Sequence, residues 1–325
     1  MNPKENYLTM LRGEIPEYIP SFFEERAGRF TEDLLTPQAA PNGPIVTSLG
    51  VTYVGSPELN NGAMPKPGVV ILEDITKWRD VIKAPDLSGF DWEKYYTDKI
   101  KNIDRSNHYI PVTGGDYFLT LVSFMGFENA LLSLYEEPEE VMALLTYVSE
   151  FYLTVFKKQI QYVKPDTMTL MDDDAGLRNP FFSVDMYREF FKPFHKLHCD
   201  IANENGILIE RHDCGKSGCF AADWVEMGVR SWNPAQTTND LKAIKKQFVG
   251  KLAICGGWDS AEHANRSEEE LRQDLIDYVD TFAPGGGFTY FAMGGGKPGT
   301  PEAKRRSEIV KDVYDNYAHD YYKTH

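Results

Sequence analysis

The tripeptide His212-Asp213-Cys214 carries the most specific chemistry in the sequence. In an extended segment, side chains separated by one residue point to the same side, so the imidazole and the thiol can reach one ion. Imidazole nitrogen and thiolate sulfur are natural ligands of Zn²⁺, and a catalytic zinc has three protein ligands and one open position. The motif therefore predicts a zinc site at His212 and Cys214. The alternative is a histidine packed at the rim of the fold beside a cysteine buried as a small apolar side chain.

A run of three carboxylates, Asp172-Asp173-Asp174, follows a predicted strand. Three adjacent acids do not all stay ionised unless a cation or a hydrogen-bond donor faces them. Acidic residues after a strand often cap the helix that follows it, and we expect one of the three to do so. The others would face a metal ion, a cationic substrate or an arginine, for which Arg178 and Arg211 are near in the sequence.

Polar and glycine-rich segments also follow other predicted strands, at the end of a parallel sheet where ligands bind. Glycines there let the backbone approach a ligand closely. We assign Asp116 and Asp173 as candidate catalytic groups that transfer protons. The candidate substrate contacts in these segments are Tyr117, Asp172, Trp258 and Gly295. Single polar loops are common in α/β proteins, so the grouping of several such loops favours a functional site.

Strand and helix patterns alternate at least six times from Ile110 onward. The expected strands span residues 110–112, 167–171, 207–210, 230–232, 252–255 and 288–291. Helical patterns lie between and after them, such as those over residues 183–204 and 268–282. Such alternation demands a parallel sheet. No Gly-x-Gly-x-x-Gly follows a first strand, which disfavours a dinucleotide-binding doubly wound sheet. We predict an α/β fold, a (β/α)8 TIM barrel with the polar segments at its mouth.

The N-terminal part of the chain differs in composition and lacks the regular alternation of strand and helix patterns. A helix is expected over residues 3–12, closed by Gly13. Residues 31–95 are rich in Pro, Gly, Asn and Thr and contain β-like pieces at 45–49 and 68–72. We interpret them as an irregular insertion, a helical and hairpin excursion within a single barrel domain over residues 1–325. Four C-terminal tyrosines at helical spacing predict internal packing or a homodimer contact; they are Tyr314, Tyr317, Tyr321 and Tyr322.

The charge of the chain excludes two classes of partner. Its 325 residues include 34 Lys and Arg against 49 Asp and Glu, a net charge of −15. A field of that sign repels nucleic acid and anionic membranes, so we expect neither as a partner. Four cysteines are too few for a disulfide scaffold and indicate reduced thiols. With no apolar signal sequence and no apolar run of about 18 residues, the chain is expected to be cytoplasmic.

Several segments resemble the uroporphyrinogen decarboxylase superfamily. Residues 24–30, Glu-Glu-Arg-Ala-Gly-Arg-Phe, resemble its N-terminal Met-Arg-Gln-Ala-Gly-Arg-Tyr signature. Residues 211–215, 226–229 and 233–234 resemble the His-x-Cys-Gly, Glu-x-Gly and Asn-Pro progression of its methyltransferase branch. Residues 252–259 resemble its glycine-rich strand end before an aspartate. The resemblance covers nearly the whole chain in order, and it implies a (β/α)8 barrel with its ligand at the C-terminal mouth.

The superfamily contains two chemistries. Its decarboxylases bind an acidic tetrapyrrole through paired arginines without a cofactor, and its methyltransferases move a methyl group between a corrinoid and an acceptor, often with zinc. Glu25 stands where the family signature has its first arginine, whereas Arg29 keeps the second, and Gly295 replaces a family histidine. Replacing a cationic clamp by Glu disfavours a polycarboxylate substrate. Glu25 and Arg29 are retained as candidate substrate contacts.

The resemblance therefore implies a corrinoid-dependent methyltransferase, with a corrinoid protein as partner and a small methyl donor or acceptor. Zinc-dependent relatives supply a third ligand, a cysteine in the loop after the last strand, and residues 292–296 contain no cysteine. The third ligand stays open between Cys219, Cys255 and the carboxylates of Glu25, Asp172 and Asp173. Two alternatives remain: a cofactor-free decarboxylase that uses Arg29 for a carboxylate and Asp116 or Asp173 as proton relay, and a non-catalytic ligand-binding barrel.

Overall fold

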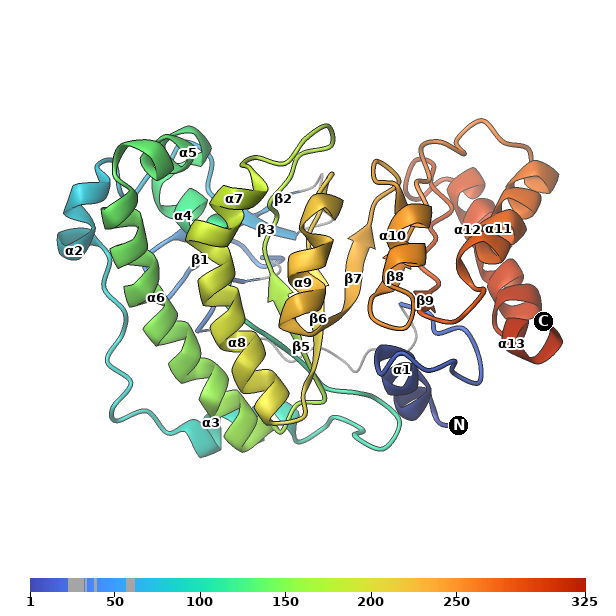
Figure 1. Ribbon diagram of the computed structural model, residues 1–325, viewed down its shortest axis with the longest axis horizontal. Coiled ribbons are helices and arrows are strands. Elements are labelled where there is room, and N and C mark those ends of the chain that lie inside the picture. Colours follow the sequence, from blue (N-terminus) through green and yellow to red (C-terminus); the bar gives the residue numbers. More distant parts are fainter. Residues whose placement is uncertain (23–31, 33, 38–39, 57–61) are drawn as a thin grey trace.

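A parallel sheet of six strands forms the centre of the computed structural model (Figure 1). The structure describes residues 1–22, 32, 34–37, 40–56 and 62–325. The strands pair in chain order; they are β4 (Pro111–Thr113), β5 (Thr167–Met171), β6 (Leu208–His212), β7 (Val229–Ala235), β8 (Ala253–Gly256) and β9 (Phe288–Thr289). The α/β class and the predicted alternation are confirmed. The strand expected over 230–232 runs on to Ala235, whereas β9 ends at Thr289, before the expected end at 291.

Helices precede the sheet, connect its strands and follow it. Their bounds are α1 (Pro3–Leu11), α2 (Trp78–Val81), α3 (Trp92–Ile100), α4 (Phe118–Met125), α5 (Phe127–Glu136), α6 (Pro138–Lys158), α7 (Val184–Met186), α8 (Lys192–Glu204), α9 (Ala221–Met227), α10 (Leu241–Gln247), α11 (Glu268–Phe282), α12 (Pro301–Val313) and α13 (Tyr321–Thr324). Helices α6, α8 and α9 pack side by side over β5, β6 and β7 (Figure 1). This layer buries the outward face of the strands that carry the candidate site.

The helix expected over residues 183–204 contains one irregular turn. Ser183 caps α7 by accepting a hydrogen bond from the backbone N–H of Met186 at 3.1 Å. A π-helical turn, Tyr187–Phe191, then joins α7 to α8, in which Pro193 occupies the first turn. Proline lacks a backbone N–H and its ring clashes with the carbonyl four residues earlier, so regular α-helical bonding cannot continue through this point.

Residues 20–22 pair with the chain just after β9 and so extend the parallel sheet toward a closed barrel. Ser21 forms a parallel bridge with Tyr290. The backbone N–H of Tyr290 donates to the carbonyl oxygen of Pro20 at 2.8 Å, and that of Phe22 donates to the carbonyl oxygen of Tyr290 at 3.1 Å. At the N-terminal end of the sheet, α1 packs Tyr7 and its neighbours against Tyr109 and Ala253. The described strands are those of a TIM-barrel fold, and their pairings leave the ring open between residues 20–22 and β4.

The N-terminal excursion contains a small antiparallel sheet of β1 (Ile45–Val46), β2 (Thr52–Ser56) and β3 (Gly62–Pro65). The β-like piece expected over 68–72 is wrong, because a turn stands at its start. Gly68 has a φ of 74°, and the N–H of Val69 donates to the carbonyl oxygen of Lys66. Pro67 followed by a glycine of positive φ is typical of a type II turn. Residues 71 and 72 then bond through their N–H groups to Phe124 at the end of α4.

The C-terminal tyrosines make contacts within the chain. The hydroxyl of Tyr314 donates to the carbonyl oxygen of Ile19, and that of Tyr322 donates to the carbonyl oxygen of Ala283. The predicted internal packing is thus confirmed for these two side chains. Within the described ranges, no single helix is long and apolar enough to cross a membrane; α4 and α5 pass that test only together, and they are bent by 110°.

Candidate functional site

Asp173, His212 and Cys214 meet at the carboxyl end of the sheet. Asp173 follows β5 closely, His212 is the last residue of β6, and Cys214 comes two residues later. The Nε2 atom of His212 lies 3.7 Å from the Sγ atom of Cys214 and 3.8 Å from the Oδ1 atom of Asp173. The three potential ligand atoms all lie within 4.8 Å of one another, and each side chain is partly exposed. We call this set the triad.

The triad fits a tetrahedral zinc ion. Zinc bonds of about 2.0–2.3 Å at tetrahedral angles place neighbouring ligand atoms roughly 3.3–3.7 Å apart. The two distances from His212 Nε2 are close to that range. One carboxylate oxygen, one imidazole nitrogen and one thiolate sulfur leave a fourth position for a substrate. Asp173 is one of the third ligands left open by the sequence, and among the residues that the structure describes, which do not include Glu25, it is the one that the geometry supplies.

The alternation of side chains along β6 explains why His212 and Cys214 share a face. Arg211 and Asp213, the residues between them, are wholly buried in the opposite direction, where the guanidinium lies 5.5 Å from the Trp224 ring of α9. A hydrogen bond of 2.8 Å from the backbone N–H of Cys214 to Asp173 Oδ1 fixes the turn after the strand. The expectation that His212 and Cys214 point to the same side is confirmed.

Asn233 orients the His212 ring, and it is not among the residues that the sequence pattern predicts for the site. Its Oδ1 atom lies 3.2 Å from His212 Nδ1. An amide oxygen only accepts, so this contact places the proton on Nδ1 and leaves the Nε2 lone pair directed at the triad. Asn233 is 3% exposed, and its Nδ2 atom has no hydrogen-bond partner in the described residues. A polar residue near the end of β7 is the sequence signal that could have identified it, because the other candidate residues also follow the polar ends of strands.

The acidic run divides its three side chains between different tasks. Asp172 is fully buried and accepts hydrogen bonds from the backbone N–H groups of Tyr117, Phe118 and Leu119 at 2.8–3.1 Å. It therefore caps the start of α4, which precedes β5 in the chain, and not the helix that follows β5, α7, which is capped by Ser183; the expected cap on the following helix is wrong for Asp172. Burial raises the pKa of Asp172, but hydrogen bonding to His195 and the nearby charges lower that pKa overall.

Asp174 belongs to a buried ion-pair network behind the triad. Arg211 donates through Nη2 to Asp174 and, at 2.6 Å, to Asp213. Burial and the charge of Asp213 raise the pKa of Asp174, and burial raises the pKa of Asp213 to about 6. One guanidinium thus faces two carboxylates that lie directly beside triad residues in the sequence. The arginine expected from the acidic run is Arg211.

Asp116 lies in a buried polar pocket beside α4. Its Oδ1 atom accepts a hydrogen bond from Thr120 and lies 3.3 Å from the hydroxyl of Thr36 and 3.5 Å from that of Tyr152. Burial, and then the charge of Asp172, raise the pKa of Asp116 to about 7. A carboxyl group with that pKa exchanges protons near neutral pH, which suits its assignment as a proton-transfer group.

The other predicted contacts lie in different places. Tyr117 is wholly buried, with its hydroxyl 2.9 Å from His198 Nε2. Trp258 donates through Nε1 to the carbonyl oxygen of Met293 at 3.0 Å and so joins the loops after β8 and β9. Gly295 belongs to the second of these loops, and a Cβ atom there would stand 3.0 Å from that of Ser260. Glu25 and Arg29 lie outside the described residues.

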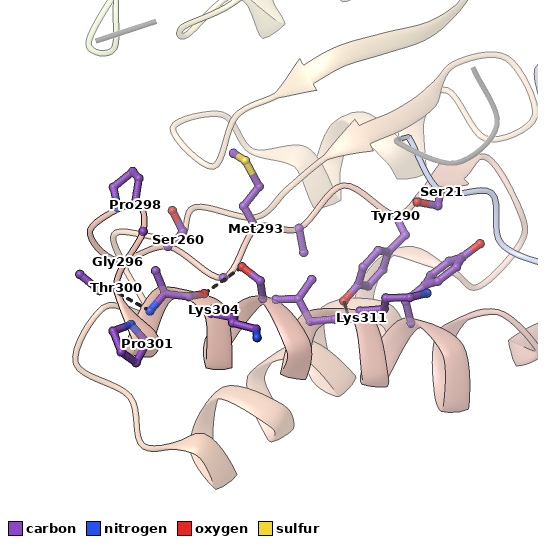
Figure 2. A pocket seen from close by; sticks show the side chains of 18 residues that line it. Ser21, Ser260, Tyr290, Met293, Gly296, Pro298, Thr300, Pro301, Lys304 and Lys311 are labelled. Atoms are coloured by element: carbon purple, nitrogen blue, oxygen red, sulfur yellow. Dashed lines mark hydrogen bonds between the residues drawn. The ribbon is translucent and has the colours of Figure 1, made fainter. Parts of the chain in front are cut away.

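A cleft of about 960 Å³ lies between the segment after β9 and helix α12. Figure 2 shows Tyr290 and Met293 on one side of it and Lys304 and Lys311 on the helix. Gly295 lines this cleft, and none of the triad residues does. The cleft and the triad are therefore separate features, and the residues that could hold a metal ion are those of the triad.

Comparison with known proteins identifies the family of the chain and a solved structure of similar fold. A family model described as uroporphyrinogen decarboxylase (URO-D) matches residues 68–305, more than half of the chain. No curated protein matches the sequence. A solved structure, a methyltransferase from Methanosarcina mazei, is similar with a TM-score of 0.59 and 13% identity over 97% of this chain and 99% of that chain. At that identity, the likeness concerns the fold.

Proposed function

The chain belongs to the uroporphyrinogen decarboxylase family, and we propose that within this family it is a corrinoid-dependent methyltransferase. Its partner is then a corrinoid protein, and its substrate is a small methylated compound or a methyl acceptor. The observation that carries the proposal is the triad, whose nitrogen, sulfur and oxygen atoms have the spacing of zinc ligands. The fold of a methyltransferase over nearly the whole chain supports the same class.

The triad residues have distinct tasks in this proposal. Asp173, His212 and Cys214 hold the zinc, which when bound would polarise a substrate oxygen or thiol as a Lewis acid. Asn233 keeps the proton of His212 on Nδ1, so that Nε2 stays free to ligate. Burial and the charge of Asp173 raise the pKa of the Cys214 thiol, so the thiol gives up its proton only when a cation replaces it.

Metal content and methyl transfer test the proposal together. The protein, purified without chelators, should contain about one zinc per chain by mass spectrometry of the metal. His212→Ala and Cys214→Ser should lose it, whereas Cys219→Ser, which removes an exposed cysteine outside the triad, should keep it. With a corrinoid protein and candidate methyl donors, the absorption spectrum of the corrinoid should change only with the zinc-loaded variants. Zinc-free wild-type protein, or transfer that survives His212→Ala, would contradict the proposal.

A cofactor-free carboxy-lyase is the second candidate, and Asp116 favours it. A buried carboxyl group whose pKa is about 7 is suited to relay a proton during decarboxylation. Incubation with uroporphyrinogen under anaerobic conditions, followed by mass measurement of the products, decides between the two. If the wild type removes carboxyl groups from uroporphyrinogen and Asp116→Asn does not, the lyase function is supported. If the substrate is unchanged after incubation with the wild type, the lyase function is excluded.

A further inference from the structure

Three lysines of helix α10 surround a cleft at the opposite end of the sheet from the triad. Lys242, Lys245 and Lys246 line a cleft of about 480 Å³ together with Val249, Thr281 and Pro284. Lys245 bonds to Gly286 and Gly287, which precede β9 and so mark the N-terminal end of the sheet. In a chain with a net charge of −15, this is a local concentration of positive charge.

Lys245 differs from its two neighbours in its surroundings. Lys242 and Lys246 are exposed, whereas Lys245 is half-buried. Its Nζ atom donates to the carbonyl oxygen of Gly286 at 2.5 Å, and the carbonyl oxygen of Gly287 lies at 3.5 Å. No carboxylate in the described residues pairs with it, and burial alone lowers the pKa of Lys245 to about 8. At pH 7, roughly one tenth of the Lys245 side chains are therefore the neutral, nucleophilic amine, far more than for a lysine with the ordinary pKa.

The same geometry selects the kind of reagent that the amine meets. The bonds to Gly286 and Gly287 hold Nζ in place, and in the neutral amine they use its two hydrogen atoms and leave the lone pair for an electrophile. The ammonium groups of Lys242 and Lys246 line the same cleft and attract an anion. We propose that Lys245 is a covalent modification site at which acyl phosphates transfer their acyl group to Nζ. This site is independent of the methyltransferase proposal, because it shares no residue with the triad.

The reaction balances without a further reagent. The Nζ lone pair of Lys245 attacks the carbonyl carbon of the acyl phosphate and forms the C–N bond. The bond from that carbon to the phosphate oxygen breaks, and inorganic phosphate leaves with the bonding electron pair. The amine loses one proton to water, and the product is an amide that no longer carries a positive charge at any pH.

Acetyl phosphate tests the proposal on the whole protein. After timed exposure at pH 7.5, peptide mass spectrometry should find Lys245 acetylated about tenfold faster or more than exposed lysines such as Lys323. The rate at Lys245 should rise with pH and level off above about 8, whereas the rates at exposed lysines should keep rising. Equal rates at Lys245 and Lys323 would overturn the proposal.

A second comparison separates recruitment of the phosphate from reactivity of the amine. The double substitution Lys242→Gln and Lys246→Gln should slow acetylation of Lys245 by acetyl phosphate several-fold. It should leave acetylation by the uncharged reagent p-nitrophenyl acetate unchanged, since Lys245 keeps its own surroundings. If both reagents slow alike, the two lysines do not recruit the anion and acyl phosphates are not the preferred class.

Discussion

His212 is held at both nitrogen atoms of its ring, by Asn233 at Nδ1 and by the rest of the triad at Nε2. We predict that Asn233→Ala weakens zinc binding about 10- to 100-fold, because the ring loses the acceptor that fixes its tautomer and orientation. Competition with a chromogenic chelator measures the affinity. The control is Asn316→Ala, which removes an exposed amide on the π-helical turn, Tyr314–Ala318, that follows α12. An affinity within twofold of the wild type would show that Asn233 does not position the ligand.

Asp173 acts on the Cys214 thiol through its charge. Its carboxylate disfavours the thiolate and, after burial, is a cause of the raised pKa of Cys214. In metal-free protein, Asp173→Asn should lower that pKa, and a disulfide reagent at pH 8 should then modify Cys214 faster. Zinc affinity should fall in the same variant, because one ligand is lost. The exposed Cys219 gives an internal control, and a slower reaction at Cys214 would contradict the assigned interaction.

At the scale of elements, the carboxylate of Asp172 joins the end of β5 to the start of α4. It satisfies three backbone N–H groups that the helix cannot satisfy itself. Asp172→Ala should therefore destabilise the fold by about 3–5 kcal/mol, since the buried donors and His195 lose their partner. Urea unfolding followed by circular dichroism measures this loss. Asp172→Asn keeps an acceptor and should restore part of the stability; a loss in Asp172→Ala below about 1 kcal/mol would exclude the capping role.

The strands and their order were predictable, because a buried parallel sheet leaves a strong apolar pattern between helical segments. The shared side of His212 and Cys214 was equally predictable from the period of two in a strand. The different roles of Asp172, Asp173 and Asp174 could not be predicted from the sequence, because they depend on the residue at which β5 ends. Asp173 points into the site, while Asp172 and Asp174 turn toward α4 and Arg211.

Other features depend on contacts between distant parts of the chain. Asn233 belongs to the site because β7 continues past the predicted strand, so that its side chain lies opposite His212 in the register. Tyr117 follows a strand as the triad residues do, yet its ring packs outward against Phe194. A pattern of residue types along one chain records neither the length of a neighbouring strand nor the side on which a loop turns.

At the scale of the whole molecule, three separate parts of the chain create the surroundings of Asp116. Thr36 comes from the N-terminal excursion, Thr120 from α4 and Tyr152 from α6. Together they exclude water from a carboxyl group that is only 5% exposed. The folded protein thus binds the Asp116 proton up to a pH of about 7, whereas the unfolded chain releases it near 3.9.

The sign of the resulting pH dependence follows from this difference. Below about pH 4 both states hold the proton, so the raised pKa costs no stability. As the pH rises toward 7, the folded state loses stability relative to the unfolded state by at most about 1.4 kcal/mol for each pH unit. We predict that Asp116→Asn, which cannot ionise, is more stable than the wild type at pH 8 and that the difference shrinks steadily down to pH 4.

Chemical denaturation of both proteins at pH 4, 5, 6, 7 and 8 measures that difference. Asp185→Asn serves as the matched control, because the Asp185 side chain is 94% exposed and its substitution should add only a small, nearly constant change. The N-terminal excursion gives a second readout. At pH 8 the buried carboxylate of Asp116 is ionised and poorly solvated, so the contact that Thr36 of the excursion makes with it is weakened. Protease cleavage within residues 40–56 should therefore be faster at pH 8 than at pH 6 in the wild type and independent of pH in Asp116→Asn, once the protease's own pH dependence is divided out. A stability difference that stays constant across the pH range would show that folding does not raise the pKa of Asp116.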